Sequence, residues 1–181
     1  MFKIYTKKGD NGTSSLLTSN KKLLKSRPIF NVLGTFDELN VSLGYLQSSR
    51  IQEVKNVCLK VQKDLFILGS YFSGKNKEVD SKKWISRIRE IEEAIDYFQK
   101  QIDPLKSFLI PGGSNESNQL HTCRVVCRRL ERIAVDYIGR KKEYLFIVKY
   151  LNRLSDLFFV MARYANKRLG YKDVVWEKDD N

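Results

Sequence analysis

The spacing of apolar residues along the chain constrains its fold more than any other feature. Between residues 81 and 102, apolar side chains recur every three or four positions, so they lie along one face of a helix. These residues are Trp84, Ile88, Ile91, Ile95, Phe98 and Ile102. Such a stripe is typical of a helix packed in a bundle, and Ser81 is expected to cap its N-terminus.

The same periodicity predicts four more helices, and therefore an all-α, five-helix bundle. The further helices cover approximately residues 30–48, 52–72, 115–138 and 142–169. Ser114 is a suitable N-cap for the fourth helix, and Gly139 and Gly170 follow the ends of the fourth and fifth helices. The sequence contains no alternating run long enough for a strand and no internal repeat.

The first part of the chain is polar and rich in Lys, Ser, Thr and Gly. It is expected to contain a short extended piece over residues 2–6 and a turn at the Asp-Asn-Gly of residues 10–12. A long arm without regular structure is uncommon unless it binds something. We expect a single domain of 181 residues, divided into an arm (1–29), a helical bundle (30–170) and a tail (171–181).

Composition argues against several classes of protein. Apolar residues make up 42% of the chain and charged residues 30%, which is ordinary for a globular protein and not for a disordered one. No apolar run approaches the roughly 20 residues that cross a bilayer, and the N-terminus does not resemble a signal peptide, so we expect a cytoplasmic protein without membrane contact. Cys58, Cys123 and Cys127 are expected to be reduced core thiols, because they lack the second ligand pair of a zinc site.

The formal net charge of +12 allows two interpretations. It is either a basic surface that keeps the protein soluble or a site for a polyanionic partner. A non-catalytic helical bundle that binds nucleic acid is therefore an alternative function, which no recognised nucleic-acid motif supports. Because the lysines are scattered, the positions of the arginines are more informative.

The arginines are concentrated beside the apolar stripe of the fourth predicted helix. The polar residues at helical spacing there are His121, Arg124, Arg128, Glu131 and Arg132. Three arginines on one face repel one another unless an anion or a carboxylate lies against them. A solvated basic face stays open as an interpretation, but guanidinium groups in a lysine-rich chain favour bidentate anion binding.

Other polar groups could contribute to such a site. Asn152 and Asp156 share a face of the fifth helix, where Asn152 could read a base edge or bond a neighbouring helix. Asp37 could be an acidic residue favoured by the dipole of the first helix, or the carboxylate partner of an arginine. The backbone amides of residues 6–15 could form an anion-binding nest or a plain surface turn, and no P-loop motif is present.

Five segments together resemble the PduO-type ATP:cob(I)alamin adenosyltransferases, in that family's order. They are residues 6–12 (TKKGDNG), 34–40 (GTFDELN), 108–113 (FLIPGG), 121–132 (HTCRVVCRRLER) and 150–156 (YLNRLSD). They span nearly the whole chain, which makes the resemblance very specific. It implies a ferritin-like, up-down five-helix bundle with an N-terminal arm, assembled as a homotrimer with ATP between neighbouring subunits.

The resemblance also implies which residues bind ATP. The positions that match triphosphate-binding residues are Thr6, Lys7, Lys8, Gly9, Ser14 and Ser15, and those that contact ATP from helix four are Arg128, Arg129, Glu131 and Arg132. Asn152 would hold the nucleoside. Lys25 is the best match to the family's phosphate-binding lysine. However, residues 19–25 lack the usual Gly and Pro and are one residue longer, which leaves Lys21 and Lys22 as rivals.

The implied reaction is attack of cobalt(I) in cob(I)alamin on the 5′ carbon of ATP, which yields adenosylcobalamin and triphosphate. By resemblance, Arg124 is an essential arginine, Asp37 is its ion-pair partner across the interface, and Phe108 closes the lower face of the corrin. Direct attack needs no general base, consistent with a chain that has a single histidine. Mg²⁺ is expected on the ATP phosphates, with no metal site of the protein's own.

Partners and alternatives follow from the same resemblance. Cob(II)alamin must be reduced before the transfer, so a flavoprotein reductase and an adenosylcobalamin-dependent mutase are expected partners. A cobalamin carrier that uses the same site without turnover is a further alternative. A di-metal carboxylate bundle is disfavoured because the sequence has no Glu-x-x-His pair.

Overall fold

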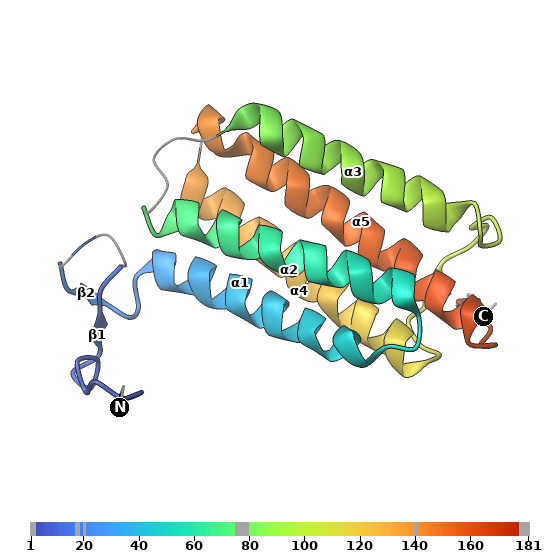
Figure 1. Ribbon diagram of the computed structural model, residues 1–181, viewed down its shortest axis with the longest axis horizontal. Helices are drawn as coiled ribbons and strands as arrows, with labels where there is room; N and C mark the ends of the chain where they lie inside the picture. Colours follow the sequence, from blue (N-terminus) through green and yellow to red (C-terminus); the bar gives the residue numbers. More distant parts are fainter. Residues whose placement is uncertain (1–2, 17–18, 20, 75–79, 140, 178–181) are drawn as a thin grey trace.

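The structure is a computed structural model that describes residues 3–16, 19, 21–74, 80–139 and 141–177. The helices are α1 (Pro28–Gly44), α2 (Gln52–Phe72), α3 (Ser81–Gln99), α4 (Asn115–Ile138) and α5 (Leu145–Arg168). Successive helices run in opposite directions along a common bundle (Figure 1). The predicted all-α, up-down five-helix bundle is therefore confirmed.

The helix ends agree with the sequence at most positions and correct it at one. The side chain of Ser114 accepts a hydrogen bond from the backbone N–H of Ser117 at 3.1 Å, as an N-cap does. The predicted cap of α3 was wrong, because Asp80 takes that position and accepts from the N–H of Lys83 at 3.0 Å. A carboxylate there also interacts favourably with the helix dipole.

Short 3₁₀ turns replace the ends of two predicted helices. The expected helix over 30–48 consists of α1 followed by the 3₁₀ turn Tyr45–Ser48, and a second such turn, Lys142–Tyr144, precedes α5. These turns leave the order and direction of the helices unchanged.

Two small antiparallel strand pairs were not predicted. In the arm, β1 (Thr13–Ser14) pairs with β2 (Leu23–Leu24), and at the far end of the bundle β3 (Leu109–Ile110) pairs with β4 (Val174–Val175). The extended piece expected over residues 2–6 lies in no strand over its described part, residues 3–6.

The core lies between the helices, with α5 packed against both α3 and α4 and with α1 packed against α2 and α4. Its largest buried side chains are aromatic, and the Trp84 indole donates to the Tyr71 hydroxyl at 3.1 Å. The carboxylate of Asp64 is also buried, accepts from the Tyr150 hydroxyl at 3.0 Å and pairs with Arg87 at 3.4 Å. Burial raises the pKa of Asp64, and these partners oppose that shift.

The turn before α4 fits tightly against the end of α5. Gly113 has a φ of 105°, and a Cβ placed on it would lie 2.6 Å from Cγ of Asn166. Both the backbone conformation and the available space therefore require glycine at this position.

We expect Gly113→Ala to lower the free energy of unfolding by about 2 kcal/mol, because it adds a strained φ and a clash with a buried side chain. Gly112→Ala is the matched control: its added Cβ would meet nothing within 4 Å, and its φ lies outside the positive range. Urea unfolding of both variants measures the difference, and equal stabilities would contradict this account.

Candidate functional site

The arm brings several of the predicted phosphate-binding residues together. The β1–β2 pair and a hydrogen bond from Lys25 N to Gly12 O (2.9 Å) fold the arm back on itself. As a result, Nζ of Lys25 lies close to Gly9, only 3.2 Å from where a Cβ on Gly9 would be. The arm thus places an ammonium group beside the predicted glycine turn.

The rival lysine Lys22 also reaches this turn, where its Nζ donates to the carbonyl of Lys8 at 3.0 Å. A surface hollow beside it is lined by Lys7, Lys8, Asp10, Asn11, Ser15 and Lys22. Lys7 has a φ of 57°, which is unusual for a residue with a side chain. Neither Lys25 nor Lys21 lines this hollow, although Lys25 approaches Gly9, and all three lysines stay candidates for phosphate binding.

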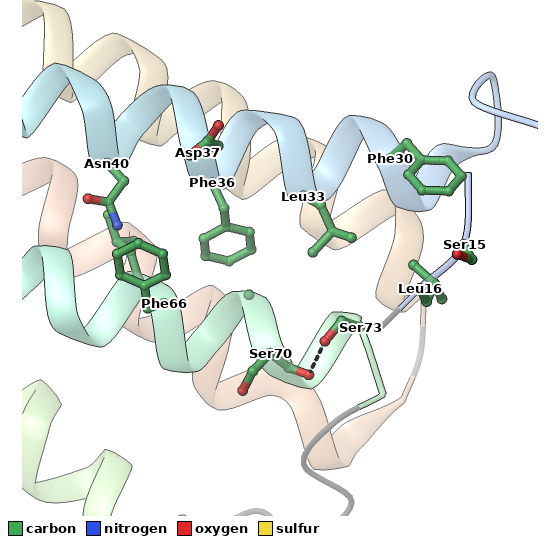
Figure 2. A pocket seen from close by; sticks show the side chains of 12 residues that line it. Ser15, Leu16, Phe30, Leu33, Phe36, Asp37, Asn40, Phe66, Ser70 and Ser73 are labelled. Atoms are coloured by element: carbon green, nitrogen blue, oxygen red, sulfur yellow. Dashed lines mark hydrogen bonds between the residues drawn. The ribbon is translucent and has the colours of Figure 1, made fainter. Parts of the chain in front are cut away.

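A cavity of about 440 Å³ lies between α1 and α2, with Ser15 and Leu16 of the arm at one end. Its walls are mainly apolar, including Phe36 and Phe66. Asp37 lies at its rim, exposed, with its carboxylate directed away from α2 (Figure 2). The predicted residues Asp37 and Ser15 therefore border one cavity.

Asn40, which follows Asp37 by one helical turn, has a structural role. Its side chain donates to the carbonyl of Gln62 at 3.1 Å and accepts from the Gln62 amide at 3.0 Å. This exchange fastens α1 to α2 below the cavity.

The polar stripe of α4 contacts α5 through Glu131. The Asn152 amide donates to Glu131 Oε1 at 3.2 Å, and its oxygen accepts from Arg153 at 3.1 Å. Of the two interpretations of Asn152, the bond to a neighbouring helix is present. The carbonyl of Arg128 accepts from Arg132 Nη1 at 3.0 Å. The structure thus brings Glu131 and Asn152 together at the junction of the two helices.

The arginines of this stripe have no carboxylate partners in the described part of the chain. No carboxylate oxygen among the described residues lies within 4.0 Å of a guanidinium nitrogen of Arg124, Arg128 or Arg132. Arg129 differs, because it pairs with Glu38 of α1. Arg128 and Arg132 are exposed and Arg124 is half-buried. Solvent reaches the first two, as on a solvated basic face, and guanidinium groups in such a row can also bind an anion.

The immediate surroundings of Arg124 disfavour its positive charge. Its Nε donates to Nδ1 of His121 at 3.4 Å, which requires a neutral imidazole acceptor. Burial and the Arg124 charge lower the pKa of His121 to about 4. Burial and the nearby Arg128 charge likewise lower the pKa of Arg124. A bound anion would relieve this repulsion.

Phe108 belongs to the segment between α3 and α4, directly before β3. That segment lies at the opposite end of the bundle from the arm (Figure 1). The side chain of Phe108 is 81% exposed, although the residue precedes a strand. Asp37 and Arg124 form no ion pair with each other among the described residues, and their pairing across a subunit interface stays a prediction. One chain therefore presents the parts of the predicted site on separate surfaces.

Sequence reasoning missed the residues that hold the Phe108 segment, above all Asn166 and Asp173. Asn166 is 2% exposed and contacts both Gly112 and Asp173. Its signal in the sequence is a polar residue within the apolar stripe of the fifth helix, next to Ala162 and Ala165. Asp173 has no comparable signal because it lies in an irregular tail.

The described residues contain no disulfide, no cluster of metal ligands and no helix that could span a membrane. The three cysteines are buried and free, as predicted, and burial raises the pKa of Cys123 to about 12. Across residues 3–177, leaving out the undescribed positions, no group of three His, Cys, Asp or Glu side chains could hold a metal ion. None of the described helices has the length and apolar character needed to span a membrane.

Comparison with known proteins adds independent information. The family model described as cobalamin adenosyltransferase matches residues 4–165. The corrinoid adenosyltransferase MMAB of Bos taurus is 35% identical, with 98% of this chain and 77% of that protein covered. The corrinoid adenosyltransferase of Bacillus subtilis is 32% identical, with 97% and 93% covered.

The fold is also similar to solved structures. A variant of the PduO-type ATP:corrinoid adenosyltransferase from Lactobacillus reuteri, complexed with cobalamin and ATP, superposes with a TM-score of 0.85. The two sequences are 29% identical, and the match covers 97% of this chain and 100% of that one.

Proposed function

Because the chain belongs to the cobalamin adenosyltransferase family, we propose how its own residues transfer the 5′-deoxyadenosyl group of ATP to the cobalt of a corrinoid. The observation that carries the proposal is the row of Arg124, Arg128 and Arg132, which lacks carboxylate partners among the described residues. Such a row fits the leaving triphosphate, on which negative charge accumulates during the reaction.

In this reaction the cobalt(I) electron pair forms a bond to the 5′ carbon of ATP, and the bond from that carbon to the triphosphate oxygen breaks. The electron pair of the broken bond leaves with the triphosphate, so no proton needs to move. The protein therefore contributes alignment and charge stabilisation, and it needs no general base.

The triphosphate would be held from two sides. On one side are the glycine turn and lysines of the arm, where Lys25 approaches Gly9; on the other are Arg128 and Arg132 of α4. The Asn152–Glu131 pair would orient the nucleoside end. A magnesium ion would neutralise phosphate charge; phosphate oxygens would hold it, since the described residues offer no cluster of ligands.

We propose that the complete site forms between neighbouring subunits of the homotrimer that the family resemblance implies. In one chain, the arm and the segment between α3 and α4, which contains Phe108, lie at opposite ends of the bundle (Figure 1). Asp37 of one subunit would pair with Arg124 of the next. In this arrangement residues 1–29 form the ATP-binding arm, 30–170 the bundle and 171–181 the tail of a single domain.

Phe108 would close the lower face of the corrin. A large exposed apolar side chain excludes water and leaves no ligand for the lower axial position of cobalt. Loss of that ligand makes cob(II)alamin easier to reduce. A flavoprotein reductase would then supply the electron, an adenosylcobalamin-dependent mutase would receive the product, and the cytoplasm would be the compartment.

The direct test mixes the purified protein with ATP, Mg²⁺ and chemically reduced cobalamin. We expect the corrinoid spectrum to change to that of the adenosylated product, with one triphosphate released per cobalt. Omitting ATP is the control. Binding of both substrates without product would instead support a cobalamin carrier, and salt-sensitive RNA binding without ATP binding would support the nucleic-acid alternative.

A further inference from the structure

The segment that carries Phe108 is held by the C-terminal tail. The backbone N–H of Trp176 donates to the carbonyl of Phe108 at 2.8 Å, and Leu109 pairs with Val175 in the β3–β4 register. Because the Phe108 side chain itself is 81% exposed, packing within the chain does not fix it. The position of Phe108 therefore depends on the backbone on either side.

Asn166 of α5 fixes that backbone on its C-terminal side. Both hydrogens of its amide are used, one on the carbonyl of Gly112 at 3.0 Å and one on Asp173 Oδ1 at 3.1 Å. Its oxygen accepts from the backbone N–H of Ser114 at 2.9 Å. One buried side chain thus links the turn after β3 to the residue before β4.

Arg163, one turn earlier on α5, acts on the other side of Phe108. Its Nη2 donates to the carbonyl of Asp103 at 2.9 Å, and its Nε pairs with Asp173 Oδ2 at 2.8 Å. Only 10% of the Arg163 side chain is exposed, so this pair is well shielded from solvent. Both oxygens of Asp173 are therefore occupied by side chains of α5.

We propose that Asp173, Arg163 and Asn166 are positioning residues that set the place of Phe108 under the corrin. The inference rests on the proposed role of Phe108. The network anchors the chain at Asp103 and Gly112, on either side of Phe108. It also anchors Asp173, which directly precedes β4, and Trp176 directly after β4 donates to the carbonyl of Phe108. Displacement of β4 would move Phe108, and among the described residues no hydrogen bond or ion pair joins Asp173 to an arginine of α4.

The test is Asp173→Ala, which leaves two donors of α5 without their acceptor. We expect kcat from cob(II)alamin with a reductant to fall about 10-fold or more, since small misplacements near a reacting centre are costly. The Kd for ATP and the rate with chemically prepared cob(I)alamin should each stay within about twofold. Electron paramagnetic resonance of the cob(II)alamin–ATP complex should show less corrinoid without a lower ligand.

The matched control is Lys167→Ala. Lys167 lies on the same helix and contacts the same loop, through an exposed ion pair with Asp103 at 3.3 Å. Exposed pairs of this kind contribute little, so all four measurements should match those of the unmodified protein. Should Asp173→Ala fail to fold, Asp173→Asn carries the same test, because its amide can accept from only one of the two donors.

Phe108→Ala separates this inference from the function on which it rests. If Phe108→Ala loses cob(II)alamin turnover and Asp173→Ala or Asp173→Asn keeps both turnover and spectrum, the positioning role is overturned. If Phe108→Ala itself is fully active, the proposed role of Phe108 fails first. The double variant should be no slower than Phe108→Ala alone, and losses that multiply would also overturn the inference.

Discussion

Replacing Arg124 with alanine is expected to lower the rate of adenosylation by about 100-fold or more, because loss of one donor to developing charge in a dry site typically costs about 3 kcal/mol of barrier. Arg124 is partly buried and unpaired with any described carboxylate, so its charge is free to act on a neighbouring subunit or on substrate. The initial rate with cob(I)alamin and ATP measures the effect.

Two further variants make this result specific. Arg89→Ala removes an exposed arginine of α3, a helix that carries none of the proposed site residues. This variant should leave the rate unchanged. Asp37→Ala should reproduce much of the Arg124→Ala loss, and the double variant should lose less than the product of the two. A decrease below threefold for Arg124→Ala would argue against its role.

Phe108→Ala should lose most turnover from cob(II)alamin, on the order of 10-fold or more, while ATP binding is retained. Removing the ring opens the lower face of the corrin to water or to the corrinoid's own base, so reduction of cobalt(II) becomes harder. Steady-state assays with cob(II)alamin and a reductant, together with ATP titration, measure both quantities.

Ile85→Ala is a suitable control for Phe108→Ala, because Ile85 is an exposed apolar residue on α3, a helix that carries none of the proposed site residues. It should change neither quantity. Equal activity of Phe108→Ala and the unmodified protein with cob(II)alamin would refute the assignment of Phe108. Equal losses with cob(I)alamin and cob(II)alamin would instead indicate damage to binding or chemistry rather than to the reduction step.

The helices could be predicted because each buries a continuous stripe whose period is visible in the sequence. In α3, Trp84 and Ile88 lie on that stripe and are buried. The cap of α3 was missed because Asp80 and Ser81 are both good capping residues, and periodicity does not distinguish adjacent positions.

The small strand pairs could not be predicted, since two residues have no detectable period and their pairing joins distant segments. Leu109 meets Val175 only because α5 returns the chain to the end of α3. The same applies to the site: the sequence identified Glu131 and Asn152 separately, but their contact depends on how α4 packs on α5. Gly113 was matched as part of a motif, and the structure supplies its physical reason in Asn166.

Helix α5 carries both Asn152, which bonds Glu131, and Asn166, which bonds the turn after Phe108. An uninterrupted α-helix rises 1.5 Å per residue, so these two amides are about 21 Å apart along its axis. Inserting a single residue between them would rotate Asn166 by about 100° and take it out of reach of its partners. The length of α5 between these two residues is therefore fixed. The surface connections differ in this respect, because lengthening a loop costs little conformational entropy.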